Sequence, residues 1–165
     1  MQHVNVRDAV ADDLAGVGAI YAHEAEHGIS TFDSVGRPAE FWRDKLSGSD
    51  VFLVAQSPAA SGGTVVGYAN ASVYRPRAAY DHTREVSVYL AAEARGQGVG
   101  KALYAELLDR LRSAGTHTAL AVIALPNEAS IRLHESFGFT RAGTLREVGR
   151  KFDRWIDTSL FQLRL

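Results

Sequence analysis

Residues 94–101 are Ala94-Arg95-Gly96-Gln97-Gly98-Val99-Gly100-Lys101, and this glycine loop separates two stretches of different periodicity. Before it, Glu85 to Leu90 is rich in β-branched and aromatic residues, a composition typical of a strand. After it, Lys101 to Ala114 carries leucines at helical spacing, and Gly115 is placed to end a helix. The sequence therefore predicts a strand, a glycine-rich loop and a helix in direct succession.

The glycine loop has the composition of a phosphate-binding turn. Glycine at three alternate positions lets the main chain approach a ligand without Cβ collisions, and the N–H groups at the start of a helix favour anions. Arg95 and Lys101 add positive charge. We predict that a pyrophosphate binds here; a turn that needs its glycines only for backbone conformation is the alternative.

Two other phosphate-binding motifs do not fit the glycine loop. The phosphate loop of NTPases needs Gly, four residues and then Gly-Lys-Ser/Thr, which this sequence lacks. The dinucleotide fingerprint Gly-x-Gly-x-x-Gly meets Lys101 where its third glycine belongs, and no acidic residue ends a strand about 20 residues later. The sequence thus argues against a kinase, an ATPase and a nicotinamide-dependent enzyme.

The rest of the chain alternates between strand and helix patterns. Further strands are predicted at His3–Arg7, Val51–Ala55, Thr64–Val73, Thr118–Ala124, Thr140–Val148 and Trp155–Leu165. Further helices are predicted at Ala11–Glu26, from Pro38 as first helical residue to a stop at Gly48, and at Pro126–Phe137. Gly28–Gly36 is predicted as a loop and Ser57–Gly63 as a hairpin turn. We expect a single α/β domain over residues 1–165.

Composition excludes several classes of protein. A net charge of −1 gives no field to hold nucleic acid or an anionic membrane. The absence of cysteine excludes disulfides, zinc–thiolate sites and a thiol nucleophile. The sequence shows no secretory leader and no run near the ~18 apolar residues that span a membrane. We expect a cytoplasmic protein.

Arg95, Gly98 and Gly100 spell Arg-x-x-Gly-x-Gly, which resembles the acetyl-CoA pyrophosphate loop of the GNAT superfamily of N-acetyltransferases. Within it, the chain is similar to the phosphinothricin and methionine sulfoximine acetyltransferase group over nearly its full length. The matching stretches are Ser30-Thr31-Phe32, Ala79-Tyr80-Asp81, Glu85 with Val88-Tyr89, Ala121-Val122-Ile123 with Leu125-Pro126-Asn127, Arg132-Leu133-His134-Glu135, and Gly143-Thr144-Leu145-Arg146.

The resemblance implies a mixed, mostly antiparallel sheet of six or seven strands, splayed where the pantetheine of acetyl-CoA enters, with helices on both faces. It also implies a homodimer with active sites near the interface, and no metal. The implied cofactor contacts are Val88, Tyr89, Leu90, Arg95, Gly96, Gln97, Gly98, Val99, Gly100, Lys101 and Asn127.

Glu85 is the candidate general base. A carboxylate within hydrogen-bond or one-water reach can take the proton that an ammonium must lose before it attacks a thioester. The resemblance implies that role at this position; a solvated glutamate at a strand end is the alternative.

A backbone N–H of Val88 or Leu90 would stabilise the charge that develops on the thioester oxygen, and the resemblance implies a bulge that turns this N–H toward the acyl chain.

His134 lies seven residues after Asn127, about two turns along the same predicted helix face, so both can meet the cofactor. Many superfamily members have a tyrosine here, as general acid for the leaving thiolate, whereas this group is similar in having histidine. His134 could protonate the thiolate, stabilise the developing charge or assist Glu85; a helix-surface histidine without a role is the alternative.

Substrate contacts are predicted in two loops. Arg75 and Arg77 precede Tyr80, and the guanidinium fork suits a carboxylate, although two solvated arginines are the alternative. The resemblance implies that an arginine and the tyrosine of this loop contact the substrate. The resemblance implies that Thr31 and Phe32 line the pocket for the side chain of the substrate. Phe139, where close relatives have tyrosine, leaves the identity of the substrate open.

His23-Glu24-Ala25-Glu26-His27 also satisfies His-Glu-x-x-His, the zinc motif of metalloproteases. The extended form of that motif needs glycine where Ser30 stands, and Gly28 ends the helix at once, so we expect a polar helix end and no metal site.

Together these observations predict an N-acetyltransferase that uses acetyl-CoA to acetylate the α-amine of a small amino-acid-like molecule, of the phosphinothricin, methionine sulfoximine or methionine sulfone type. Two alternatives stay open. One is an acetyltransferase for a protein N-terminus, a lysine or a polyamine. The other is a non-catalytic regulator that binds acyl-CoA.

Overall fold

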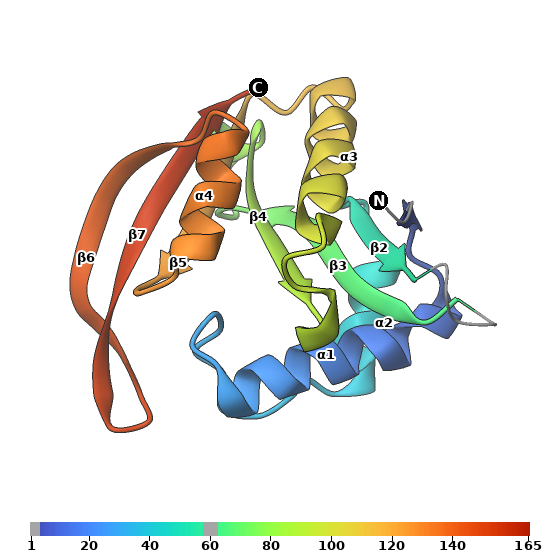
Figure 1. The fold of residues 1–165 in the computed structure, drawn as a ribbon. Coiled ribbons are helices and arrows are strands. Elements are labelled where there is room, and N and C mark those ends of the chain that lie inside the picture. Colours follow the sequence, from blue (N-terminus) through green and yellow to red (C-terminus); the bar gives the residue numbers. More distant parts are fainter. Residues whose placement is uncertain (1–3, 58–62) are drawn as a thin grey trace.

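A computed structural model describes residues 4–57 and 63–165, which form a seven-stranded sheet with helices on both faces (Figure 1). The strands lie in the order β1-β2-β3-β4-β5-β7-β6, and only β4 and β5 run parallel among these neighbours. They are β1 (Asn5–Asp8), β2 (Phe52–Gln56), β3 (Val65–Val73), β4 (Thr83–Leu90), β5 (Thr118–Ala124), β6 (Thr140–Lys151) and β7 (Arg154–Arg164). The predicted mixed, mostly antiparallel sheet is confirmed.

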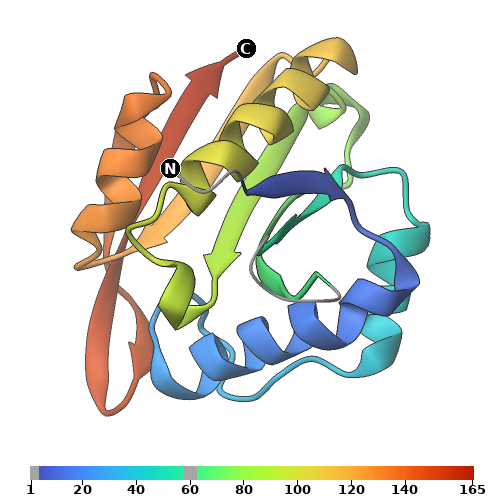
Figure 2. The ribbon, with the colours of Figure 1, turned by 45° about the vertical axis from the view of Figure 1, so that its right-hand side comes forward.

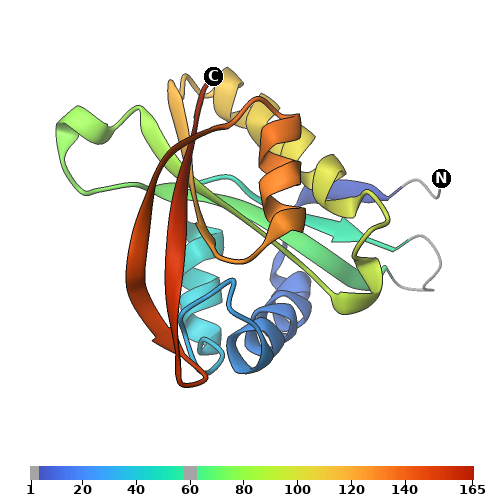
Figure 3. The same cartoon turned by 60° about the vertical axis from the view of Figure 1, so that its left-hand side comes forward.

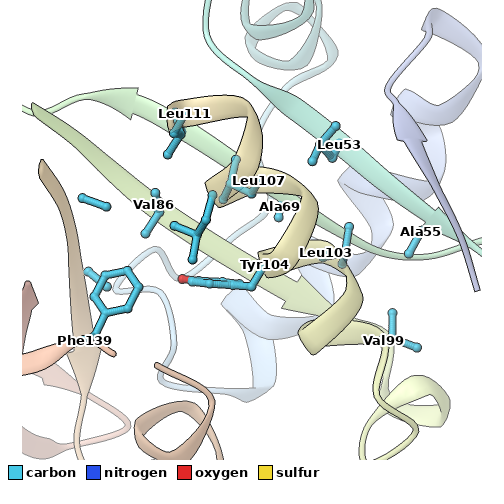
Figure 4. Close-up of a cluster of buried hydrophobic side chains, with 14 of the residues drawn as sticks. Leu53, Ala55, Ala69, Val86, Val99, Leu103, Tyr104, Leu107, Leu111 and Phe139 are labelled. Atoms are coloured by element: carbon cyan, nitrogen blue, oxygen red, sulfur yellow. The ribbon is translucent and has the colours of Figure 1, made fainter. Parts of the chain in front are cut away.

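The helices cover the two faces of the sheet through separate apolar clusters. They are α1 (Leu14–His27), α2 (Ala39–Ser47), α3 (Val99–Ser113) and α4 (Glu128–Ser136), with 3₁₀ turns at Ala11–Asp13, Ala78–Tyr80 and Ala92–Ala94. The α3 leucines pack with Val86 and Phe139 on one face (Figure 4). The opposite face is covered by α1 and α2 (Figure 2). These two helices pack through Val17 and Trp42 against Tyr68. Successive β4 residues therefore point into different layers.

The sheet opens between its two parallel strands. Pairing of β4 with β5 runs from Thr83 with Thr118 to Glu85 with Leu120, and there the register ends. Both strands continue, β4 to Leu90 and β5 to Ala124. Backbone groups along the separated edges face a gap where an adjoining strand would otherwise satisfy them, so the predicted splay is confirmed.

Two predicted helix starts differ from the structure, both at prolines. Pro38 has ψ 160°, which is extended, and is the N-cap of α2 rather than its first helical residue. Pro126 lies before α4, whose N-cap is Asn127; its side chain accepts a hydrogen bond from the Ser130 N–H at 3.1 Å. A capping amide, and not the fixed φ of proline, sets this helix start.

Other boundaries agree with the sequence analysis to within a few residues. α3 begins two residues earlier than predicted, and β6 continues to Lys151, three residues past the predicted end. The predicted start of the first strand at His3 and most of the predicted turn at Ser57–Gly63 lie outside the described residues.

β6 and β7 extend beyond the rest of the sheet as a long hairpin (Figure 3). We call residues 145–156, its outer part, the hairpin arm. The arm exposes the large apolar side chains of Leu145, Val148, Phe152 and Trp155. In the described part of the chain, no helix has the length and apolarity that crossing a bilayer requires.

Candidate active site

A cavity of about 500 Å³ opens where β4 and β5 separate. Its walls come from β4, the glycine loop, α3, β5 and α4, and from Glu24 and Ser30 at the end of α1. The cavity is lined by residues of both α3 and α1, which cover opposite faces of the sheet. It therefore passes through the sheet between β4 and β5. Two ligands could approach one point from the two faces.

The glycine loop forms one end of this cavity. Gly96 and Gly98 have φ of 74° and 83°, and a Cβ at either would meet nothing within 4 Å, so conformation and not space requires glycine there. Gly98 is the N-cap of α3, which directs the first N–H groups of the helix into the loop. This end of the cavity is therefore suited to an anion.

Most of the predicted cofactor contacts line the cavity. They are Val88, Tyr89, Leu90, Arg95, Gly96, Gly98, Gly100, Lys101 and Asn127. Gln97 and Val99 are the exceptions: the Gln97 amide donates to the Glu93 carbonyl, and Val99 is buried in the core. Val99, whose side chain is buried, can therefore contribute to ligand binding only through its backbone.

The free edge of β4 presents backbone N–H groups to the cavity. Ala91 N–H donates to the Val66 carbonyl in β3, and hydrogen-bonding direction alternates along a strand, so Val88 and Leu90 direct theirs toward the gap. The expected bulge is wrong, because β4 keeps an unbroken register with β3 from Arg84 to Leu90. Separation of β5 exposes these groups without a bulge.

Glu85 does not line the cavity but directly precedes the part of β4 that does. It is the last β4 residue paired with β5, and the cavity lining begins at the next residue, Val86. Its half-buried side chain points to the α1 and α2 face, as does that of Tyr89. Burial raises the pKa of the Glu85 carboxyl above its ordinary 4.5. A raised pKa suits a general base, and that role stays a prediction.

His134 and Tyr104 form a buried hydrogen-bonded pair in the cavity wall. His134 Nδ1 lies 2.7 Å from the Ser130 carbonyl oxygen, which can only accept, so Nδ1 carries the proton. In the neutral ring Nε2 then accepts, and the Tyr104 hydroxyl donates to it at 2.7 Å. Burial lowers the pKa of His134 and raises that of Tyr104, which keeps both neutral near pH 7.

This geometry bears on the three roles left open for His134. A neutral ring with its proton on Nδ1 has none on Nε2 to give to a leaving thiolate. The proton between the two side chains belongs to the Tyr104 hydroxyl, which donates it to His134 Nε2. His134 is therefore placed to orient Tyr104, and it is not a helix-surface histidine.

The first part of the connection between α1 and α2 borders the cavity on the sheet face opposite α3. We call this segment, residues 28–33, the α1–α2 loop. The Ser30 N–H donates to Glu24 at 3.0 Å, and the Ser30 carbonyl accepts from the Tyr89 hydroxyl at 3.3 Å. The other oxygen of Glu24 lies 3.2 Å from the Arg95 guanidinium of the glycine loop. Tyr21 hydrogen-bonds to the Thr31 hydroxyl at 2.8 Å. Loop and cavity wall are thus held together.

The predicted substrate contacts lie outside the cavity lining. Thr31 and Phe32 follow Ser30, which lines it, so they stand at its edge. Arg75, Arg77 and Tyr80 are exposed in the β3–β4 connection, and Tyr80 packs edge-on against Tyr74 at 5.3 Å. The roles of all five stay predictions.

The His-Glu-x-x-His segment makes other contacts. The rings of His23 and His27 stack at 4.7 Å between centroids, and the carboxylate of Glu24 is engaged by Ser30 and Arg95. Within residues 4–57 and 63–165, no group of three or more histidine, aspartate or glutamate side chains is arranged to hold a metal ion.

Sequence reasoning missed Tyr104, Ser30 and the contacts of Glu24. Tyr104 precedes Leu107 and Leu108 by three and four residues, on the buried face of α3. A tyrosine within an apolar stripe needs a partner for its hydroxyl, and that signal could have linked it to His134. Nothing in the sequence indicates that Glu24 meets Arg95, 71 residues away.

Comparison with known proteins bears on this site. The model of the acetyltransferase (GNAT) family matches residues 16–139. A phosphinothricin N-acetyltransferase from Streptomyces coelicolor is 40% identical over 96% of this chain and 95% of its own length. An L-methionine sulfoximine/L-methionine sulfone acetyltransferase from Pseudomonas paraeruginosa is 36% identical over 98% of this chain and 94% of its own.

A solved structure agrees with these relatives. The crystal structure of a phosphinothricin acetyltransferase from Sinorhizobium meliloti in complex with AcCoA superposes with a TM-score of 0.94. The two chains are 36% identical, and the match covers 100% of this chain and 89% of that one.

Proposed function

This chain belongs to the acetyltransferase (GNAT) family, and on that premise we propose that it acetylates the α-amine of a small amino-acid-like molecule with acetyl-CoA. One observation carries the proposal: a cavity crosses the sheet between β4 and β5, with the glycine loop at one end and the α1–α2 loop on the opposite face. Donor and acceptor can therefore meet at one point in a ternary complex.

The residues present suit acetyl-CoA, which would supply the acetyl thioester. The glycine loop, the start of α3 and the charges of Arg95 and Lys101 fit a pyrophosphate. The outward N–H groups of Val88 and Leu90 would hydrogen-bond along the free edge of β4, and Asn127 would contact the cofactor from the start of α4.

Glu85 would remove one proton from the acceptor ammonium, directly or through one water. The freed amine nitrogen forms a bond to the carbonyl carbon as the carbon–sulfur bond breaks, while an N–H of Val88 or Leu90 stabilises charge on the oxygen. The nitrogen loses a second proton and the sulfur gains one. A chain without cysteine cannot form an acyl-cysteine, which supports direct transfer.

Tyr104 and His134 would act as a unit on the leaving sulfur. His134 accepts the Tyr104 hydrogen bond at 2.7 Å and fixes the hydroxyl in the cavity wall. The hydroxyl has a single proton, so it would hydrogen-bond to the sulfur by turning that proton from His134 Nε2 toward the charge that develops there. His134 is then a positioning residue, and Tyr104 is the group that contacts the reacting atoms.

The acceptor would be of the phosphinothricin, methionine sulfoximine or methionine sulfone type, as the names of the relatives suggest. Thr31 and Phe32 would wall its side chain, while Arg75, Arg77 and Tyr80 would bind its anionic groups. We place this reaction in the cytoplasm.

The first experiment measures free thiol released from acetyl-CoA with a panel of amines. We expect release with methionine sulfoximine, methionine sulfone and phosphinothricin, and little with polyamines or a lysine peptide. Release only with the peptide or a polyamine would contradict the proposed substrate class. Binding of acetyl-CoA without release on any amine would favour a non-catalytic regulator.

We also propose a homodimer, because the hairpin arm exposes Leu145, Val148, Phe152 and Trp155 within 11 residues of chain. Such a concentration of exposed apolar side chains marks an interaction surface. Light scattering should give about twice the 17.9 kDa mass of the chain. A monomeric mass at micromolar concentration would contradict the proposal.

A further inference from the structure

We propose that Lys151 is a positioning residue that holds the α1–α2 loop, and that the turn of the β6–β7 hairpin thereby decides which acceptors fit. This inference rests on the proposed function and deepens it, because it names the part of the chain that shapes the acceptor side of the cavity. Figures 1 and 2 show the turn of the hairpin beside the loop that follows α1.

The first support is the contact of Lys151 itself. Its side chain is buried, with 7% of the residue exposed, and Nζ donates to the Thr31 carbonyl at 2.9 Å across 120 residues of sequence. The neighbouring residue Ser30 is bound on both sides, by Glu24 and Tyr89. Lys151 therefore fixes the loop from outside while those two residues fix it from the cavity.

The second support is the packing of Phe32 on the hairpin. A Cβ at Gly149 would lie 2.3 Å from Cε2 of the Phe32 ring, far closer than carbon atoms approach. Gly149 does not have a left-handed φ, so space and not conformation requires glycine. The ring lies directly on the backbone of β6, and its position depends on that strand.

The third support is the conformation of the turn. Phe152 and Asp153 have φ of 51° and 56°, a left-handed conformation in which Asn-Gly is favoured and a bulky residue is unfavourable. The Phe152 ring lies 5.2 Å from Lys151 Nζ, a cation–π contact. Phe152, which adopts this unfavourable conformation, thus contacts the Lys151 ammonium that hydrogen-bonds to the loop.

Burial lowers the pKa of Lys151 overall, and two nearby carboxylates offset part of the cost of burying its ammonium. The carboxylates of Glu24 and Asp33 act on Lys151 and oppose the lowering of its pKa by burial. A methionine has similar length but supplies neither charge nor donor, whereas an arginine supplies both. A comparison of lysine, methionine and arginine at position 151 therefore distinguishes a positioning role from simple packing.

The test compares Lys151→Met with Lys151→Arg. Arg154→Met is the control, because Arg154 is the exposed residue that pairs with Lys151 across the turn and this variant also removes one positive charge. Hydrogen exchange of residues 28–33, acetyl-CoA binding by calorimetry and acceptor kinetics are measured. We expect Lys151→Met to speed exchange in the loop and raise the acceptor KM about tenfold, with kcat and acetyl-CoA affinity changed about twofold or less. Lys151→Arg should recover most of the KM, and Arg154→Met should behave as the native protein.

A double-mutant cycle tests the Phe32 contact. Gly149→Ala should raise the acceptor KM in the native chain and add nothing once Phe32→Ala has removed the ring. Unchanged loop exchange and KM in Lys151→Met would overturn the inference and leave the proposed function intact. A native protein that binds acetyl-CoA but acetylates no amine would overturn the proposed function and the claim about acceptors, while loop exchange would still show whether Lys151 holds the loop.

Discussion

Replacing Glu85 with glutamine should lower kcat by about 100-fold or more, which is the usual contribution of a general base. Glutamine keeps the size and polarity of the side chain but cannot take a proton. The glycine loop and the free edge of β4 are unchanged, so acetyl-CoA affinity should stay within about twofold. Thiol-release kinetics and calorimetry measure the two quantities.

The pH profile sharpens this prediction. Because burial raises the pKa of Glu85, the native kcat/KM should fall as pH drops through a value above 4.5, where the carboxylate becomes protonated. Glu85→Gln should lack this acidic limb. Glu40→Gln, which neutralises an exposed carboxylate on α2, is the control and should keep full activity. Full turnover in Glu85→Gln would remove Glu85 from the mechanism.

Replacing His134 with phenylalanine should lower kcat by about 10- to 100-fold and the free energy of unfolding by about 2 kcal/mol. Phenylalanine fills the aromatic site formed with Phe139 and Phe161, but leaves the buried Tyr104 hydroxyl without its acceptor. Steady-state kinetics and urea unfolding measure these effects.

Two further measurements identify the role of the pair. If His134 acts through Tyr104, then His134→Phe and Tyr104→Phe should each lower kcat, and the double variant should be no slower than the slower single one. Additive losses would show that His134 acts independently.

Stability should also depend on pH through His134. Its folded pKa lies below the ordinary 6.5, so below that pH the unfolded chain binds the proton more strongly. This contribution to stability is present above 6.5 and is lost as pH falls toward the folded pKa. His134→Phe should lack that part of the pH dependence.

Periodicity and glycine placement were enough to predict most of the helices and strands, whereas the mixed, splayed sheet was implied by the resemblance to a known family. The glycine loop, the leucine face of α3 and the apolar run of β5 each indicate one kind of element, because burial and backbone conformation constrain them locally. The predicted start of α4 at Pro126 was wrong because the side chain of Asn127 caps this helix. The same local reasoning singled out Arg95 and Glu85 as candidates, since each adjoins a recognisable element.

Contacts between distant segments could not be predicted in this way. His134 was identified as a candidate, but its proton position depends on Ser130 and its neutral state on burial. Its partner Tyr104 is 30 residues away, on another helix. A pKa or a tautomer depends on surroundings that periodicity does not describe.

The sequence by itself determined the order of the elements and the position of the glycine loop, because each depends on residues close together in the chain, and its resemblance to a known family indicated the class of chemistry. Only the tertiary structure decided where β4 leaves β5, how Tyr104 meets His134, and how Lys151 reaches Thr31 across 120 residues. Those contacts depend on the packing of whole layers and on the length and bend of the hairpin, and packing is a property of the assembled core.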